Sequence, residues 1–353
     1  MRELATQRRW RSPGIAAALG AAVLFGASVP FAKLLLGALS PWLLAGLLYL
    51  GAGIGLTLTR LTRPRAAIRL EPGEWRWLAG AIVAGGMVAP VLLMYGLAAM
   101  PASGAALLLN AETVFTALLA WCVFRENFDR RIALGMAIIV VGALVLAWPG
   151  EARFGALWPA LAVLGAGLGW ALDNNLTRKV ALTDATWIAA CKGWAAGVVN
   201  LGIAALVVDH WPPAATVAAA VVLGWACYGL SLVLFVVALR HLGTARTSAY
   251  FSVAPFVGAL IALPLLDEPL TLRLLFAGVL MALGVWLHLT EKHRHEHTHE
   301  ILEHEHAHVH DLHHQHAHEM PVAAGVRHTH RHRHAAQAHQ HAHFPDAHHR
   351  HGH

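Results

Sequence analysis

The sequence predicts an all-α, polytopic membrane protein with ten transmembrane helices in two inverted five-helix repeats, followed by a disordered, histidine-rich C-terminal tail. Its composition carries this prediction. The 353 residues are 57% apolar and only 13% charged, whereas charged residues make up roughly 25% of an ordinary soluble domain. Charged residues are rare between Pro13 and Thr290, and histidines crowd the segment that follows. The chain therefore divides into a lipid-embedded part and a hydrated tail.

Ten mostly apolar stretches have the length of about twenty residues that a bilayer-spanning helix needs. They are residues 14–39, 41–60, 77–98, 102–124, 131–148, 156–176, 185–208, 214–239, 245–266 and 270–290. The predicted domains are a cytoplasmic N-terminus (1–13), a first repeat (14–148), a second repeat (156–290) and the tail (291–353). The first stretch lacks a small-residue cleavage site, so we expect it to be retained as a membrane helix.

The distribution of basic residues predicts the orientation. Outside the spans and before the tail, sixteen Lys or Arg residues fall on one side and only Arg153 and Arg273 on the other. Short basic loops remain in the cytoplasm, so both termini are expected there, in a prokaryotic inner (plasma) membrane. This bias also accounts for the net charge of +6 without nucleic acid as a partner.

An internal repeat relates the two halves. A shift of 142 residues lays Ala105–Trp148 over Thr247–Thr290, with Glu126 on Glu268 and Gly142 on Gly284. Each copy shows a small-residue start, an apolar run, an acidic turn and a glycine-containing apolar run. Five spans per copy reverse the second copy across the membrane. Inverted repeats of this kind build many secondary transporters, with the substrate site between them near the bilayer midplane.

The two hairpins CVFRENFDRRIALGMAIIVVGALVL and LPLLDEPLTLRLLFAGVLMALGVWL close the repeats, and the opening FGASVPFAKLLL carries Gly26 seven residues before Lys33. These motifs resemble the EamA branch of the drug/metabolite transporter superfamily over residues 14–290. The resemblance implies alternating access without ATP hydrolysis and, usually, export of small metabolites such as amino acids.

Few ionisable residues lie inside the spans, where such groups usually face a cavity or a partner. Glu112 is the best candidate, because it lies about ten residues from each end of its span; the alternative is a hydrogen bond or ion pair between helices. Asp173 opens the run Asp173–Asn174–Asn175 and could pair with basic neighbours. Lys192 and Lys33 are candidates for a site but could also extend to the membrane surface. Asn110 is a minor candidate for the cavity lining.

The tail holds twenty-three of the twenty-six histidines, largely in alternation. Neutral imidazole binds Zn, Ni and Co, so a flexible run can chelate metal without a preformed site. We nominate one cluster: His295, His297, His299, His304, His306, His308 and His310. The alternative is a pH-sensitive polar tail.

The leading hypothesis is a gradient-coupled exporter of small polar, amino-acid-like metabolites, in which Glu112 titrates. The alternative is a divalent-metal exporter or a metal-regulated transporter that uses the tail. An intramembrane hydrolase built on Glu112 and Asp173 is disfavoured, because neither His nor Cys accompanies them at helical spacing. No cofactor is expected beyond metal on the tail. The expected partners are a small-molecule substrate, the lipid bilayer and, as an option, a second copy of the chain.

Overall fold

The computed structural model describes residues 13–61, 70, 73–124, 130–148, 157–180, 183–208 and 211–289, with four tail segments, 296–299, 303–308, 328–333 and 337–340. The helices form one compact unit and the tail strands belong to another. Six described helices are long and apolar enough to cross a membrane: Pro13–Leu35, Pro41–Leu61, Trp75–Ala99, Ala102–Val123, Ala185–Val207 and Ala214–Leu242. The prediction of a helical, polytopic membrane protein is confirmed at this level.

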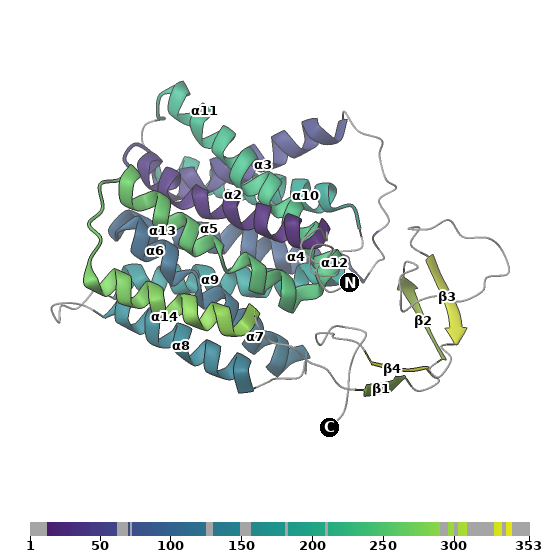
Figure 1. Cartoon of the computed structure of the whole chain (residues 1–353). Coiled ribbons are helices and arrows are strands. Elements are labelled where there is room, and N and C mark those ends of the chain that lie inside the picture. The colour runs from purple at the N-terminus through teal and green to yellow at the C-terminus, as the bar shows by residue number, and fades with distance from the viewer. Residues whose placement is uncertain are drawn as a thin grey trace. The chain divides into compact units, whose positions relative to one another are not determined.

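The first half of the helical unit begins with α2 and α3 and continues through two interrupted helices to α8 (Figure 1). Its elements are α2 (Pro13–Leu35), α3 (Pro41–Leu61), α4 (Trp75–Ala81), the π-helix η1 (Ile82–Val88), α5 (Ala89–Ala99), α6 (Ala102–Leu108), α7 (Ala111–Phe124) and α8 (Arg130–Ala147). The chain runs from α4 through η1 into α5 without leaving helical geometry, whereas α6 and α7 are separated by a turn at Leu109–Asn110.

The second half repeats this order. Its elements are α9 (Trp158–Thr177), the short 3-10 helix η2 (Arg178–Val180), α10 (Ala185–Val207), α11 (Ala214–Leu223), the π-helix η3 (Gly224–Leu230), α12 (Ser231–Phe251), α13 (Ala254–Leu265) and α14 (Leu272–Leu289). The 142-residue shift lays η1 on η3 and α8 on α14, residue for residue. The repeat therefore extends beyond the segment that the sequence comparison detected.

Two breaks differ from the expected spans. The predicted connection between 239 and 245 is helical, because α12 continues to Phe251. The helix breaks instead at Ser252–Val253, just before Pro255, because proline has no N–H to continue the hydrogen bonds of α12 and is favoured in the first turn of a helix such as α13. In the first half the break at Leu109–Asn110 interrupts the predicted fourth span. There the Asn110 side-chain amide donates to the Leu107 carbonyl at 3.0 Å, which offers the backbone an alternative to the helix.

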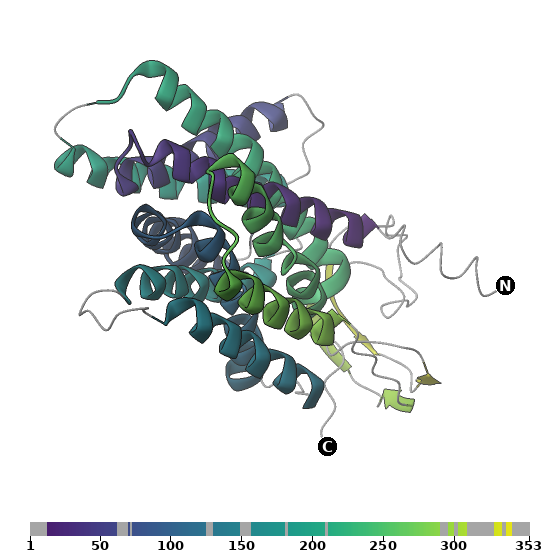
Figure 2. The same cartoon turned by 60° about the vertical axis from the view of Figure 1, so that its left-hand side comes forward.

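Contacts between helices follow the repeat. Helix α3 packs on its counterpart α10, and α8 packs on its counterpart α14. Helix α2 packs on α12 and α13, while its counterpart α9 packs on α5 and α7. Figures 1 and 2 both show α8 and α14 side by side. The two halves thus exchange equivalent contacts, as expected for a two-fold pseudo-symmetric pair.

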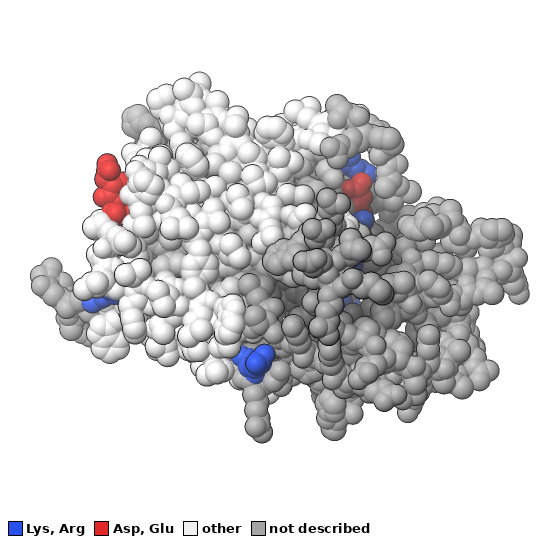
Figure 3. Space-filling view, in the orientation of Figure 1, with Lys and Arg blue, Asp and Glu red and all other residues white. Residues whose placement is uncertain are grey.

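Many large apolar side chains of the described helices are exposed on the outer surface of the helical unit. Along α14 the exposed positions recur at helical spacing: Leu272, Leu275, Phe276, Val279, Leu283 and Trp286. Figure 3 shows a broad face without charge and small charged patches near its edges. Exposed apolar area of this extent is unfavourable in water, at roughly 25 cal/mol per Å², but it is the expected surface of a helix bundle in lipid.

The tail segments form two antiparallel pairs of strands. Strand β1 (Glu296–His299) pairs with β4 (Gln337–Gln340), and β2 (Glu303–His308) pairs with β3 (His328–Arg333). The sequence predicts a disordered tail, whereas these segments of it pair as strands in the structure. Alternating His with other residues has the two-residue period of a strand, and pairing satisfies backbone groups that a single strand leaves open.

Close backbone contact between α3 and α10 predicts a difference between two glycines of α10. A Cβ on Gly197 would lie 2.6 Å from the Leu50 backbone nitrogen, whereas a Cβ on Gly202 would meet no atom within 4 Å. Gly197→Ala should therefore destabilise the purified protein by about 1–3 kcal/mol, the usual penalty of overpacking. Gly202→Ala is the matched control and should be neutral or slightly stabilising. Thermal unfolding in detergent measures both, and equal melting temperatures would contradict the close packing.

Candidate functional site

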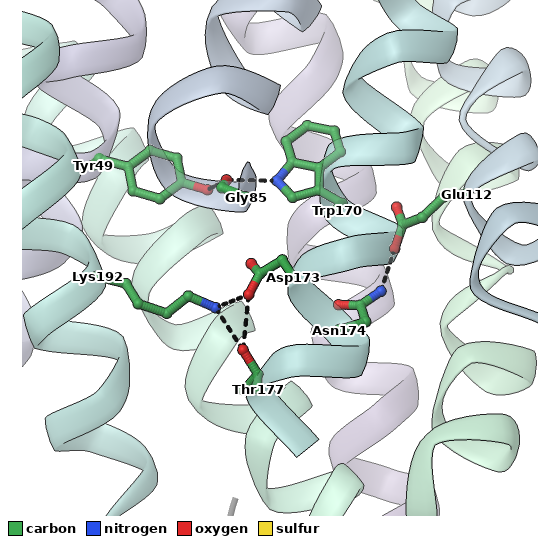
Figure 4. Close-up of polar contacts among 8 residues, drawn as sticks. All are labelled: Tyr49, Gly85, Glu112, Trp170, Asp173, Asn174, Thr177 and Lys192. Atoms are coloured by element: carbon green, nitrogen blue, oxygen red, sulfur yellow. Dashed lines mark hydrogen bonds and ion pairs between the residues drawn. The ribbon is translucent and has the colours of Figure 1, made fainter. Parts of the chain in front are cut away.

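A backbone carbonyl of η1 that lacks a backbone donor is the meeting point of side chains from two other helices. In a π-helix each carbonyl accepts from the N–H five residues later, and Ala84 accepts from Ala89 in this way. The corresponding donor for Gly85 would be Pro90, which has no N–H. The Gly85 carbonyl instead accepts from the Tyr49 hydroxyl at 2.6 Å and from Trp170 Nε1 at 3.0 Å. Side chains of α3 and α9 therefore meet at η1 (Figure 4).

A buried ion pair lies beside this junction. Lys192 on α10 donates to Asp173 on α9, and it also donates to the Thr177 hydroxyl at 3.0 Å. Thr177 in turn donates to the same Asp173 oxygen at 2.8 Å. Lys192 is 1% exposed and Asp173 is 5% exposed. Charges buried to this degree require partners, and here each charge has one.

Gly85 also leaves room for the Asp173 carboxylate. A Cβ on Gly85 would overlap the Asp173 side chain, including its second oxygen, Oδ2. Only a residue without a side chain fits between η1 and the carboxylate. Gly85 therefore has two roles. Its carbonyl accepts from Tyr49 and Trp170, and its lack of a side chain leaves room for the Asp173 carboxylate.

Glu112 lies at the first turn of α7, just after the break at Leu109–Asn110. It is buried, and the Asn174 side-chain amide donates to its Oε1 at 2.8 Å. Within the described residues no hydrogen bond reaches its second carboxylate oxygen (Figure 4). Glu112 is thus held at one oxygen, and the other remains for a proton or a ligand.

One face of α9 presents most of these contacts. Trp170, Asp173, Asn174 and Thr177 recur at intervals of three, one and three residues, which places them on one side of a helix. This polar stripe faces α3, α7 and α10, from which Tyr49, Glu112 and Lys192 project (Figure 4). The site is therefore built across the interface between the two repeats.

A cavity opens beside the stripe. Its empty volume is about 560 Å³, which includes space that is open to solvent. Its polar lining includes Glu112, Asp173, Asn174 and Ser231. Six aromatic side chains also line it: Phe25, Tyr49, Trp170, Tyr228, Phe235 and Phe251. Their rings pack mostly edge to face, with Phe25 and Trp170 centroids 5.2 Å apart and Phe235 and Phe251 centroids 4.9 Å apart. Phe25, Glu112 and Phe251 also line a second hollow beside the breaks at Leu109 and Ser252.

Comparison with known proteins identifies the chain at this point. The profile of the EamA-like transporter family matches residues 12–148 and 157–290, one match for each half. The chain belongs to the EamA-like transporter family. An uncharacterized transporter of Methanothermobacter thermautotrophicus is 26% identical over 299 residues, which cover 80% of this chain and 86% of that protein. A solved crystal structure superposes with a TM-score of 0.63 at 18% identity, covering 78% of this chain and 96% of the other; it supports the fold alone.

This EamA-like transporter brings three of the five nominated membrane residues together. Glu112 and Asp173 line the cavity, and Lys192 lies behind Asp173 as its partner. Lys33 is elsewhere: its ammonium donates to the carbonyls of Leu97 at 2.6 Å and Met100 at 3.1 Å, at the end of α5. Such a contact caps a helix C-terminus.

Asn110 lies at the break between α6 and α7, and it is absent from the described residues that line the cavity. Of the nominated histidines, His297, His299, His304, His306 and His308 fall in the tail strands, while His295 and His310 lie outside the described residues. Among the residues whose side chains the structure describes, which do not include those of the tail strands, no three His, Cys, Asp or Glu residues converge as a metal site.

Sequence reasoning missed the aromatic lining, Asn174 as the partner of Glu112, and Gly85. One signal could have found Asn174: the spacing of Trp170, Asp173, Asn174 and Thr177 marks a polar helix face. Pro90 indicates a carbonyl without a backbone donor, but an α-helix would place that carbonyl at Gly86, so Gly85 follows only from the π-helix. The aromatic residues carry no such signal, because they come from several helices and occupy ordinary apolar positions.

The buried ion pair of this EamA-like transporter predicts a non-additive pair of substitutions. Lys192→Met leaves Asp173 buried without its cation, so we expect a loss of about 3–5 kcal/mol in stability. The double variant Asp173→Asn with Lys192→Met removes both charges and should recover a large part of that loss. Thermal unfolding of the purified variants measures this, and equal losses in the single and double variants would contradict the pairing.

Proposed function

We propose that this EamA-like protein is a gradient-coupled secondary transporter that exports small polar, amino-acid-like metabolites by alternating access. Its ten helical spans would form two inverted five-helix repeats in a cell inner membrane, with both termini in the cytoplasm. The observation that carries the proposal is Glu112, a buried carboxyl at the repeat interface that lines two hollows and has one described hydrogen bond.

Contacts between helix ends support the ten-span topology. Arg60 pairs with Asp184 at 3.3 Å, and Arg240 donates to the Thr183 carbonyl at 2.7 Å. All four residues belong to connections or helix ends that the basic-residue bias assigns to the cytoplasm.

Contacts at the opposite ends agree with this assignment. Lys33 contacts the end of α5, the Glu268 carboxylate accepts from the Ala102 and Ser103 backbone N–H groups, and Arg273 donates to the Trp148 carbonyl. Each of these contacts joins segments that the same bias assigns to the outer side.

Glu112 is suited to coupling because its two oxygens have different environments. The Asn174 amide can donate to Oε1 whether the carboxyl is charged or neutral, so the group keeps its position in both states. The second oxygen can then hold either a proton or a cationic group of the substrate, but not both. Competition between the two at one carboxyl exchanges protons for substrate across the membrane.

Conformational change would use the interruptions in the helices. The π-helices η1 and η3 occur at equivalent positions of the two repeats, and turns separate α6 from α7 and α12 from α13. Such interruptions are where helices bend, and broken helices commonly surround transporter sites. Glu112 follows one of these turns by two residues, so movement of α6 relative to α7 would reach it directly.

The coupling role predicts a selective loss. Proteoliposomes with a pH dye inside measure the proton flux. When an amino acid or its decarboxylated amine is added outside and is exchanged for protons, the dye should record a loss of protons from the interior. Glu112→Gln keeps the volume and the Asn174 contact but cannot carry the proton, so its proton flux should fall by at least about tenfold. Asp267→Asn, an exposed acid of the connection between α13 and α14, is the matched control and should retain the flux. Proton flux unchanged in Glu112→Gln would contradict the proposal.

A metal-related role of the tail is the second candidate, favoured by the register of its strands. Four pairs of directly opposed residues are both histidine: His297 with His339, His304 with His332, His306 with His330, and His308 with His328. Directly opposed residues of an antiparallel pair share a face of the sheet. Histidines so paired would be suited to bind Zn, Ni or Co.

Removal of the tail distinguishes metal binding by the tail from metal transport by the helices. Everted vesicles with an imposed pH gradient should bind Zn through the full-length chain, and a chain ending at Thr290 should lose at least most of that binding. Zn accumulation that persists in the truncated chain and disappears in Glu112→Gln would instead make metal the transported substrate. Equal Zn binding by both chains without accumulation would contradict the tail as the metal site.

A further inference from the structure

We propose that the central cavity takes a monovalent organic amine with an aromatic or similarly bulky apolar body, and that it rejects the zwitterion that carries an additional carboxylate. The inference rests on the proposed transport function and changes its substrate class, from small amino-acid-like metabolites to amines that lack a carboxylate. It excludes intact aromatic amino acids in favour of the amines that lack their carboxyl group.

The side chains that line the cavity favour a cationic ligand. Among the described residues that line it, Glu112 and Asp173 are acidic and none is Lys, Arg or His. The Lys192 ammonium faces Asp173 and Thr177, and the Lys33 ammonium is held by carbonyls at the end of α5. Once Lys192 balances Asp173, ionised Glu112 leaves one negative charge for the ligand. A ligand carboxylate would be buried near Glu112 without a cation, which is costly in a low-dielectric site.

The aromatic walls of the cavity favour a ligand with a bulky apolar body. Phe25 lies at the centre of an aromatic cluster, with ring centroids 5.2 Å from Trp170, 5.7 Å from Tyr228 and 5.5 Å from Phe251. Aromatic faces attract cations and also accommodate flat apolar groups. A small polar metabolite would leave these rings without contacts. An amine with an aromatic body uses the rings and the free carboxylate oxygen together.

A third group remains for the ligand. Tyr228 lines the cavity and is 6% exposed. Among the described residues its hydroxyl has the Ser28 side chain nearby but no hydrogen bond of good geometry. The hydroxyl oxygen can therefore accept from the N–H groups of a bound amine, which would reduce the cost of its burial.

Three ligands that share a phenyl ring test the inference. They are 2-phenylethylamine (amine alone), phenylalanine (amine and carboxylate) and 3-phenylpropionate (carboxylate alone). Binding of radiolabelled 2-phenylethylamine to the purified full-length protein in detergent is measured directly, and the other two compounds are used as competitors. We expect both competitors to bind at least about tenfold more weakly than the amine, because each brings a carboxylate into the cavity.

Two variants locate the binding. Glu112→Gln should weaken amine binding by roughly 30-fold or more, since it removes the buried charge that pairs with the ammonium. Phe25→Leu keeps an apolar side chain but removes a ring and should weaken it by about 3- to 30-fold. Asp267→Asn should have no effect. Melting temperatures close to that of the unaltered protein would verify that each variant is folded.

The outcomes are distinct. Phenylalanine binding as tightly as the amine, or no amine binding at millimolar concentration, would overturn the inference. Amine binding that depends on Glu112 without gradient-driven uptake into proteoliposomes would support the inference and overturn the transport function. Gradient-driven uptake of phenylalanine by a protein that does not bind the amine would support the transport function and overturn the inference.

Discussion

In a bilayer every backbone polar group must find its partner within the protein, because lipid supplies none. The Gly85 carbonyl shows how this constraint is met without a backbone donor. The π-helix shifts its expected donor to Pro90, which has no N–H, and side chains from two other helices replace that donor. Tyr49 and Trp170 are thereby fixed at the wall of the cavity, and Asp173 lies against the same glycine. One carbonyl without a backbone donor thus brings together several residues of the site.

The two repeats provide a common scaffold, and the site lies where they differ. At the 142-residue shift Glu112 corresponds to Ala254, Asp173 to Phe31 and Lys192 to Leu50. Pro90, which frees the Gly85 carbonyl, corresponds to Leu232. The π-helices and the closing hairpin helices, by contrast, coincide in both copies. Shared elements determine how the helices pack and bend, and the divergent residues supply an asymmetric polar site.

The acids of the site have different electrostatic roles. Lys192 balances the charge of Asp173, and the pair joins α9 to α10. Glu112 has an amide as its described partner, and an amide can support either protonation state. A buried carboxyl with a balanced charge is a structural element, whereas one without a cation can exchange a proton for a ligand. This difference makes Glu112 the proposed coupling residue.

The amino-acid sequence by itself determined the membrane class, the helical composition, the repeat and its 142-residue shift, because these follow from hydropathy and local order along the chain. It also singled out Glu112, Asp173 and Lys192, since ionisable residues within apolar runs are conspicuous. Only the tertiary structure decided that Lys192 balances Asp173, that Asn174 supports Glu112, that Lys33 caps α5, and that aromatic rings line the cavity. Those relations join different helices, and hydropathy along one helix does not reveal which neighbour its side chains will meet.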